Sequence, residues 1–220
     1  MPAARAEALQ ALLQAGQKRG EFPVAARLVA PLLLDMRPAP DLDWFAPQAA
    51  RALYAADRPI EARQWVQLGG PAAQAQLFLV ARLAQGANGP AWPKDGLGSV
   101  FEGLQPKDGG VDPGKSLLAA ALLTAVGEPM TPTDWAALVA VPPAPPAPLP
   151  NAALWLDGRD AAANKRLGET VLDTLLMAQS GGRLAAEPIV IAEAVARLRA
   201  VGLEADARRL AVEAALAAGF

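Results

Sequence analysis

Apolar side chains recur along the chain at the three- and four-residue spacing of amphipathic helices. In the first such segment, residues 3–14, the apolar positions are Ala4, Ala8, Leu9, Leu12 and Leu13. Gly16 or Gly20 can end this helix, because glycine is common just past a helix end. A second predicted helix covers residues 24–34, so the chain begins with a candidate helical hairpin.

Three later stretches share one outline, in which a helix ends, the chain turns tightly and a second helix begins. They are residues 52–63, 153–164 and 197–208. Their predicted turn positions are Asp57, Gly158 and Gly202, where the backbone is often left-handed; glycine accepts that conformation freely and aspartate tolerates it. Gly20 gives a weaker fourth copy, and the four positions are separated by 37, 101 and 44 residues.

An alanine follows five residues after each of the three predicted turns, at Ala62, Ala163 and Ala207. This position is where the second helix of a hairpin would cross the first most closely. We therefore expect a larger side chain at any of the three to push the paired helices apart.

The middle of the chain has room for further helices. Helical spacing predicts them over residues 71–85, 97–104, 113–126 and 131–141. Thr131 is a good N-cap, Pro132 suits the first helical position and Asp134 suits the positive end of the helix. About nine to eleven helices are expected in all.

A proline-rich run interrupts the helical pattern at residues 142–150. Proline fixes its own backbone angle and restricts the residue before it, so this run should be extended. We interpret it as a stiff connector between an N-terminal lobe, residues 1–141, and a C-terminal lobe, residues 151–220; the alternatives are one continuous domain and, for the run itself, a ligand for an SH3-like module.

Composition supports an all-α fold with no significant β-sheet. Hydrophobic residues make up 53% of the 220 positions, which excludes wholesale disorder, and much of this share is alanine, the best helix former. Strand-forming residues are scarce: there are only three isoleucines and one tyrosine.

Charge and hydropathy narrow the possible partners and compartments. The formal net charge of −2 gives no basic excess to neutralise a phosphate backbone, so no nucleic-acid partner is expected. The longest apolar stretch, residues 117–126, is about half of the ~20 residues that span a bilayer, so no direct membrane insertion is expected. The sequence fits a soluble protein of the cytoplasm or of the periplasm, because the absence of cysteine does not distinguish between these two compartments.

Little catalytic chemistry is available to this sequence. It has no histidine and no cysteine, which removes thiol nucleophiles, imidazole bases and the usual zinc sites. Closely spaced carboxylates occur at residues 41/43, 157/160 and 204/206, where helix capping and solvation explain them. We therefore predict no enzyme activity, no metal and no cofactor.

Residues 109–116 match the phosphate-binding pattern G-x-x-x-x-G-K-[ST] letter for letter. The fixed positions are Gly109, Gly114, Lys115 and Ser116. No buried strand precedes them in the sequence, Pro113 removes an N–H from the loop, and Asp112 adds a negative charge. The match is interpreted as a false positive in which Asp112 caps a helix and Pro113 opens it.

The repeated hairpin outline resembles the tetratricopeptide-like family of helical repeats, in which antiparallel helix pairs of about 34 residues stack side by side. The resemblance implies scaffold or adaptor work rather than catalysis. We therefore predict a non-enzymatic interaction module that binds a protein or peptide on one helical face, and the alanine-rich, arginine-over-lysine composition resembles that of high-GC bacteria. The alternatives are a helical accessory region of a larger cell-envelope protein or enzyme and, less favoured, nucleotide binding at residues 109–116.

The candidate partner-binding residues lie around the first clear turn. They are Arg51, Arg58, Arg63 and Trp65. The arginines suit an acidic partner, and tryptophan is a common interface anchor, although in helical repeats it also fills the space between helices. The identity of the partner, the binding face and the oligomeric state stay open at this stage.

Overall fold

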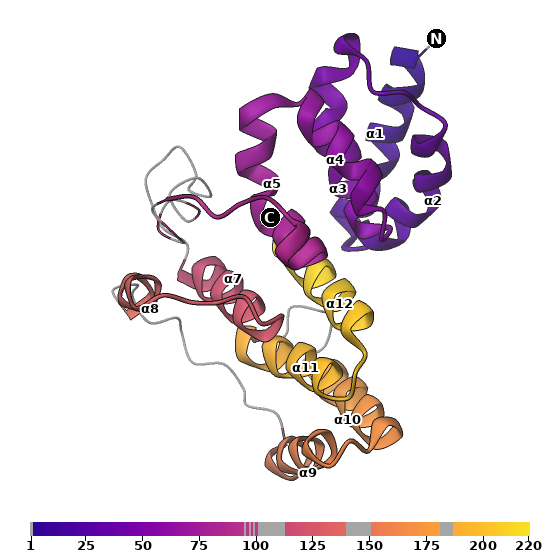
Figure 1. The fold of residues 1–220 in the computed structure, drawn as a ribbon. Helices are drawn as coiled ribbons and strands as arrows, with labels where there is room; N and C mark the ends of the chain where they lie inside the picture. The colour runs from indigo at the N-terminus through magenta and orange to yellow at the C-terminus, as the bar shows by residue number, and fades with distance from the viewer. Residues whose placement is uncertain are drawn as a thin grey trace. The chain divides into compact units, whose positions relative to one another are not determined.

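The computed structural model describes residues 2–94, 96, 98, 100, 113–139, 151–180 and 187–220 (Figure 1). These residues contain eleven α-helices, two short 3₁₀ helices and no β-strand. The predicted all-α fold class and number of helices are confirmed. None of the described helices is both long and apolar enough to cross a membrane.

The chain forms two compact units, Met1–Pro90 with Gly219–Phe220, and Ala91–Ala218. The proline-rich connector at residues 142–150 lies outside the described residues, so the division into lobes around it stays a prediction.

In the first unit, each α-helix packs against the next α-helix along the chain. Its elements are α1 (Pro2–Arg19), α2 (Phe22–Leu34), η1 (Pro40–Phe45), α3 (Ala46–Ala55), α4 (Pro59–Leu68), α5 (Gly70–Gln85) and η2 (Gly86–Asn88). In addition, α1 contacts α3, and α3 contacts α5. This order of contacts is compatible with consecutive helical hairpins.

The second unit contains six described helices. They are α7 (Pro113–Ala125), α8 (Pro132–Val139), α9 (Ala152–Ala163), α10 (Leu167–Ser180), α11 (Pro188–Ala200) and α12 (Glu204–Ala217). From α9 to α12 each helix again packs on the next, whereas α7 packs mainly against α11 and also contacts α12 (Figure 1). The packing of α7 therefore departs from the order of the chain and brings α7 next to α11.

Five helix ends share one turn geometry. The residues with positive φ are Gly20, Asp57, Gly127, Lys165 and Gly202. In each case the next residue donates its backbone N–H to the carbonyl five positions earlier, at 2.8–2.9 Å, as in Arg58 to Leu53 and Leu203 to Leu198. This is the Schellman arrangement, which satisfies carbonyls that a helix end leaves unpaired. The five turn residues are separated by 37, 70, 38 and 37 residues.

The prediction of a turn at Gly158 is wrong. Gly158 is buried inside α9, and the turn comes seven residues later, at Lys165, which adopts the left-handed conformation at φ 59°. Glycine serves close packing here, because the Cβ of an alanine at position 158 would fall onto the guanidinium of Arg197. The prediction that Ala163 lies at a close helix crossing is also wrong, because Ala163 is exposed at the end of α9.

The other two close-crossing alanines are placed as predicted. Ala62 and Ala207 have no exposed surface, and each lies five residues after a left-handed turn residue. In the hairpin of α9 and α10 the equivalent residue is Thr170, also fully buried. The predicted start of α8 is confirmed as well: Thr131 Oγ1 accepts the Asp134 N–H at 3.2 Å, and Asp134 Oδ2 accepts the Thr131 N–H at 2.8 Å.

Replacing Ala62 or Ala207 with leucine is expected to lower the free energy of unfolding by roughly 1–3 kcal/mol through overpacking. Ala163→Leu is the matched control and should change it by less than about 0.5 kcal/mol, because Ala163 is exposed. Chemical unfolding, monitored by circular dichroism, measures the free energy of unfolding of the three variants. Equal losses in the three variants would contradict the assigned crossing positions.

Candidate functional site

The predicted partner-binding group does not form one surface. Trp65 is 2% exposed and packs edge-to-face on Phe45, with ring centroids 5.9 Å apart. A tryptophan this deeply buried cannot contact a partner, so the prediction for Trp65 is wrong: it belongs to the core of the first unit. Trp65 thus supplies a large, well-packed aromatic ring where α4 meets the end of η1.

Arg51 is also buried, although it carries a charge. Its guanidinium lies over the ring of Phe22 in α2, 5.3 Å from the ring centroid. The Nε and Nη2 atoms have no hydrogen-bond partner, and burial lowers the pKa of Arg51. Its position in the core means that Arg51 cannot act as an exposed anchor for an acidic partner.

Arg58 and Arg63 are exposed, but Arg63 is engaged within the first unit. Its Nη2 donates to the Asn88 carbonyl at 3.0 Å and to Gln85 Oε1. Gln85 Nε2 in turn donates to the Tyr54 hydroxyl at 3.3 Å. Burial raises the pKa of Tyr54 to about 12, although the positive charge of Arg63 acts to lower it. Arg63 therefore ties α4 to α5 and η2, whereas Arg51 reaches toward α2.

Of the segment that matches the phosphate-binding pattern, residues 109–116, only residues 113–116 are among those that the structure describes. Lys115 and Ser116 lie in the first turn of α7, which begins at Pro113 as predicted, and Ser116 is buried. Gly109 lies outside the described residues. Among the described residues no group of three or more acidic side chains is placed to hold a metal ion.

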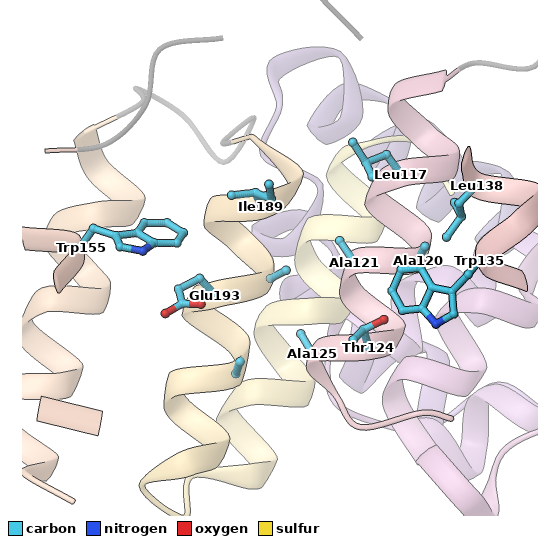
Figure 2. Close-up of a pocket in the computed structure, with 12 residues that line it drawn as sticks. Leu117, Ala120, Ala121, Thr124, Ala125, Trp135, Leu138, Trp155, Ile189 and Glu193 are labelled. Carbon is cyan, nitrogen blue, oxygen red and sulfur yellow. The ribbon is translucent and has the colours of Figure 1, made fainter. Parts of the chain in front are cut away.

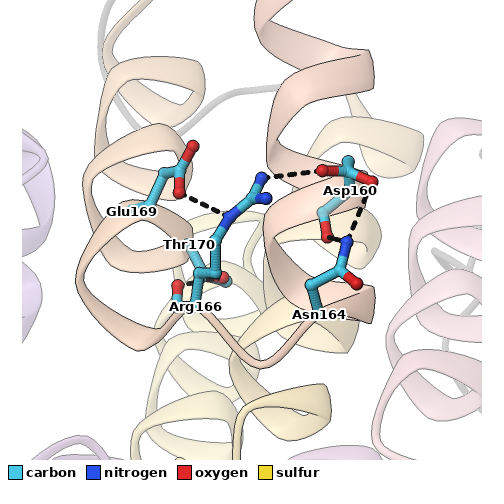
Figure 3. Close-up of polar contacts among 5 residues, drawn as sticks. All are labelled: Asp160, Asn164, Arg166, Glu169 and Thr170. Atoms are coloured by element: carbon cyan, nitrogen blue, oxygen red, sulfur yellow. Dashed lines mark hydrogen bonds and ion pairs between the residues drawn. The ribbon is translucent and has the colours of Figure 1, made fainter.

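Asp160, one of the carboxylates singled out in the sequence, is engaged in local contacts. Arg166 lies between Asp160 and Glu169, with nitrogen–oxygen distances of 2.8 and 2.6 Å, and Asn164 Nδ2 donates to Asp160 Oδ1 at 2.9 Å (Figure 3). The hydrogen bond with Asp160 raises the pKa of Arg166. These contacts lie on the solvent side of the turn between α9 and α10, where they fix the turn at Lys165.

Glu204 has a similar structural role at the start of α12. Its two carboxylate oxygens accept from Arg199 and Arg208, each at 2.8 Å. Burial acts to raise the pKa of Glu204, but the bonds with Arg199 and Arg208 outweigh it, so the pKa is lowered.

An apolar groove in the second unit is the strongest candidate for a binding site. Its volume is about 420 Å³, and α7, α8, α9 and α11 all contribute to its lining. The larger side chains around it are Leu117, Trp135, Leu138, Trp155 and Ile189. The remaining lining consists of alanines on α7 and α11, Thr124 and Glu193. Small residues between large ones leave a hollow that is apolar almost throughout.

The two indoles stand on opposite sides of the groove, with α7 and α11 between them (Figure 2). Trp135 is 48% exposed and Ile189 is 59% exposed, so their apolar surface is accessible. Exposed aromatic and branched side chains around a hollow are typical of protein and peptide binding surfaces.

A buried arginine holds one wall in place. The Arg197 guanidinium lies over the Trp155 ring, 5.4 Å from its centroid, and Nη2 donates to the Trp155 carbonyl at 2.7 Å. Arg197 also pairs with Glu193 at 3.1 Å, and Glu193 is 3.6 Å from the exposed Arg159. Among the described residues that line the groove, Glu193 alone is charged, and its charge is thus neutralised. Trp155 is fixed before any ligand arrives.

Sequence reasoning did not find this groove. Trp135 and Trp155 have the same residue type as the buried Trp65, and nothing in the local pattern separates an exposed indole from a buried one. Their convergence depends on the packing of α7 against α11, which does not follow the order of the chain.

No protein-family model, curated protein or solved structure matches the chain.

Proposed function

We propose that this chain is a non-enzymatic interaction module, built as a tetratricopeptide-like array of helical hairpins, that binds an apolar segment of a partner protein in the groove between α7, α8, α9 and α11. The observation that carries the proposal is a pair of tryptophans, the exposed Trp135 and the partly buried Trp155, on opposite sides of an apolar hollow of about 420 Å³. Most of the binding energy in such sites comes from a few aromatic anchors in water-excluding pockets.

The repeat architecture is supported by the five equivalent Schellman turns. Three of their four spacings are 37 or 38 residues, and the fourth, 70, is close to twice that value. A repeat of about this length is typical of stacked helix pairs, whose extended surfaces hold other proteins. A bacterial source remains an inference from the composition.

The lining of the groove also indicates the chemistry of the bound segment. The described residues of its walls offer no unpaired charge, since Glu193 is already bound by Arg197 and Arg159. A charged side chain buried there would lose hydration without gaining a partner. The bound segment should therefore present two or three large apolar side chains and keep its charges at the rim.

Peptides selected from a displayed random library against the intact chain provide the test, with affinities measured by isothermal titration calorimetry. Trp135→Ala is expected to weaken the selected peptides by roughly thirtyfold, the loss of one aromatic anchor. Leu156→Ala is the matched control and should leave affinity unchanged, because Leu156 is an exposed apolar residue of α9 that does not line the groove. Failure to select any peptide, or equal affinity in the Trp135 variant, would refute the proposal.

A further inference from the structure

The first hairpin exposes an apolar surface that the groove of the second unit does not explain. We call it the α1–α2 face; it consists of Leu12, Ala15, Arg19, Glu21, Val24 and Leu28, which surround a shallow hollow of about 180 Å³. Val24 and Leu28 are 56% and 68% exposed, and Leu12 is nearly half exposed. Leu32, also exposed, continues the row one turn further along α2.

Helix α2 is apolar on two sides, which a helix at the edge of a monomer does not need. One side packs in the core of the first unit through Phe22, Val29 and Leu33. The other carries Val24, Leu28 and Leu32 at four-residue spacing, and Arg27 is the only charged residue in the helix. A helix that is hydrophobic all round is normally buried on all sides. The outer side of α2 is therefore suited to a second contact.

The base of the face is fixed by a close helix crossing. Gly16 of α1 is buried, and a Cβ added there would be 2.5 Å from the Ala25 Cβ. This close approach leaves a hollow between the two rows of larger side chains, with Leu12 on one side and Val24 and Leu28 on the other. A ridge of apolar side chains from another molecule would fill it.

The charges at the end of the face identify what kind of molecule fits. Arg19 ends α1 and Glu21 precedes α2, so opposite charges stand at the same end of the face. Within the part of the chain that the structure describes, neither side chain forms an ion pair. A surface with an apolar centre and both signs of charge at one end is complementary to itself.

We propose that the α1–α2 face binds the same face of a second copy of this chain, with the two-fold axis parallel to the helices. In this arrangement α1 of one copy lies over α2 of the other, and their dipoles are antiparallel. Arg19 of each copy then lies opposite Glu21 of the other, and the apolar side chains of the two faces pack together at the centre. An isologous pair of this kind is the commonest form of protein oligomer.

Sedimentation equilibrium of the intact chain over a range of concentrations tests the proposal. We expect a monomer–dimer equilibrium and no larger species, because a two-fold contact closes on itself. Leu28→Asp should weaken the dimer by at least about a hundredfold, since it places a charge at the apolar centre. Val24→Glu, at the neighbouring exposed position, should act in the same way; circular dichroism establishes that both variants keep their helices.

A charge exchange tests the geometry. Arg19→Glu alone and Glu21→Arg alone each bring like charges together in both symmetry-related pairs, which lie at the same end of the axis, and should weaken the dimer by about tenfold. The double variant Arg19→Glu/Glu21→Arg restores opposite pairs and should regain nearly all of the original affinity. Leu172→Asp, at an exposed leucine of α10, is the control and should not alter dimerisation.

Several results would overturn the proposal: a monomer at every concentration, a dimer that Leu28→Asp leaves intact, a series of larger oligomers, or a double charge variant as weak as the single ones. The last result would show that the two copies do not pair about this axis. Peptide binding to the groove is measured separately on Leu28→Asp, so the outcome for the groove does not depend on the outcome for the dimer.

Discussion

Trp65→Ala is expected to lower the free energy of unfolding of the first unit by about 3–5 kcal/mol. Trp65 is among the largest fully buried side chains of the protein, and its edge-to-face contact with Phe45 joins α4 to the end of η1. Alanine would leave a cavity that the surrounding helices can fill only in part. Because a typical domain is stable by only about 5–15 kcal/mol, the first unit of the variant should be close to unfolding at room temperature.

Urea unfolding followed by circular dichroism measures this effect, and the two units should be allowed separate transitions in the fit. Trp44→Ala is the matched control: Trp44 precedes Phe45 but is 43% exposed, and its Nε1 donates to the Asp41 carbonyl at 3.1 Å. We expect the control to cost about 1 kcal/mol or less. A Trp65→Ala variant of unchanged stability would show that Trp65 is not a core residue and would reopen its assignment to partner binding.

The fold was largely predictable because its signals are local. Helical spacing, the cap at Thr131 and the left-handed positions Asp57 and Gly202 all depend on a few neighbouring residues, and the structure confirms them. The turn at Lys165 carries no such signal, since lysine has no preference for positive φ. Glycine was misleading for the opposite reason: it marks either a left-handed turn or a close approach between elements, and the sequence alone does not distinguish Gly158 from Gly202.

The candidate site could not be predicted, because it depends on contacts between distant segments. Arg51, Arg58 and Arg63 are neighbours in sequence, but a helix end and a turn separate them, and Arg51 and Arg63 reach toward different helices. Trp135 and Trp155 become a pair only because α7 packs against α11. Adjacency in the sequence therefore predicted an arginine cluster that the structure does not form, and it gave no indication that Trp135 and Trp155 line one groove.

Gly158→Ala is expected to lower the free energy of unfolding of the second unit by about 2–3 kcal/mol, although alanine is the better helix former by about 1 kcal/mol. The added methyl would collide with the guanidinium of Arg197 and would lie 3.1 Å from the Cβ of Asp173. Arg197 is almost completely buried, and moving it away would break its bond to the Trp155 carbonyl and its ion pair with Glu193. The loss of these charged hydrogen bonds outweighs the gain in helix propensity.

Gly168→Ala is the matched control, and its effect should have the opposite sign. Gly168 lies in the first turn of α10, is exposed, and would have no atom within 4 Å of an added Cβ. The same substitution should therefore stabilise the protein by about 0.5–1 kcal/mol. Because Arg197 also holds Trp155 against the groove, Gly158→Ala should weaken peptide binding, whereas Gly168→Ala should not. If both alanine variants are stabilised and bind peptide equally well, Arg197 does not occupy the space beside Gly158, and the preformed wall of the groove has to be abandoned.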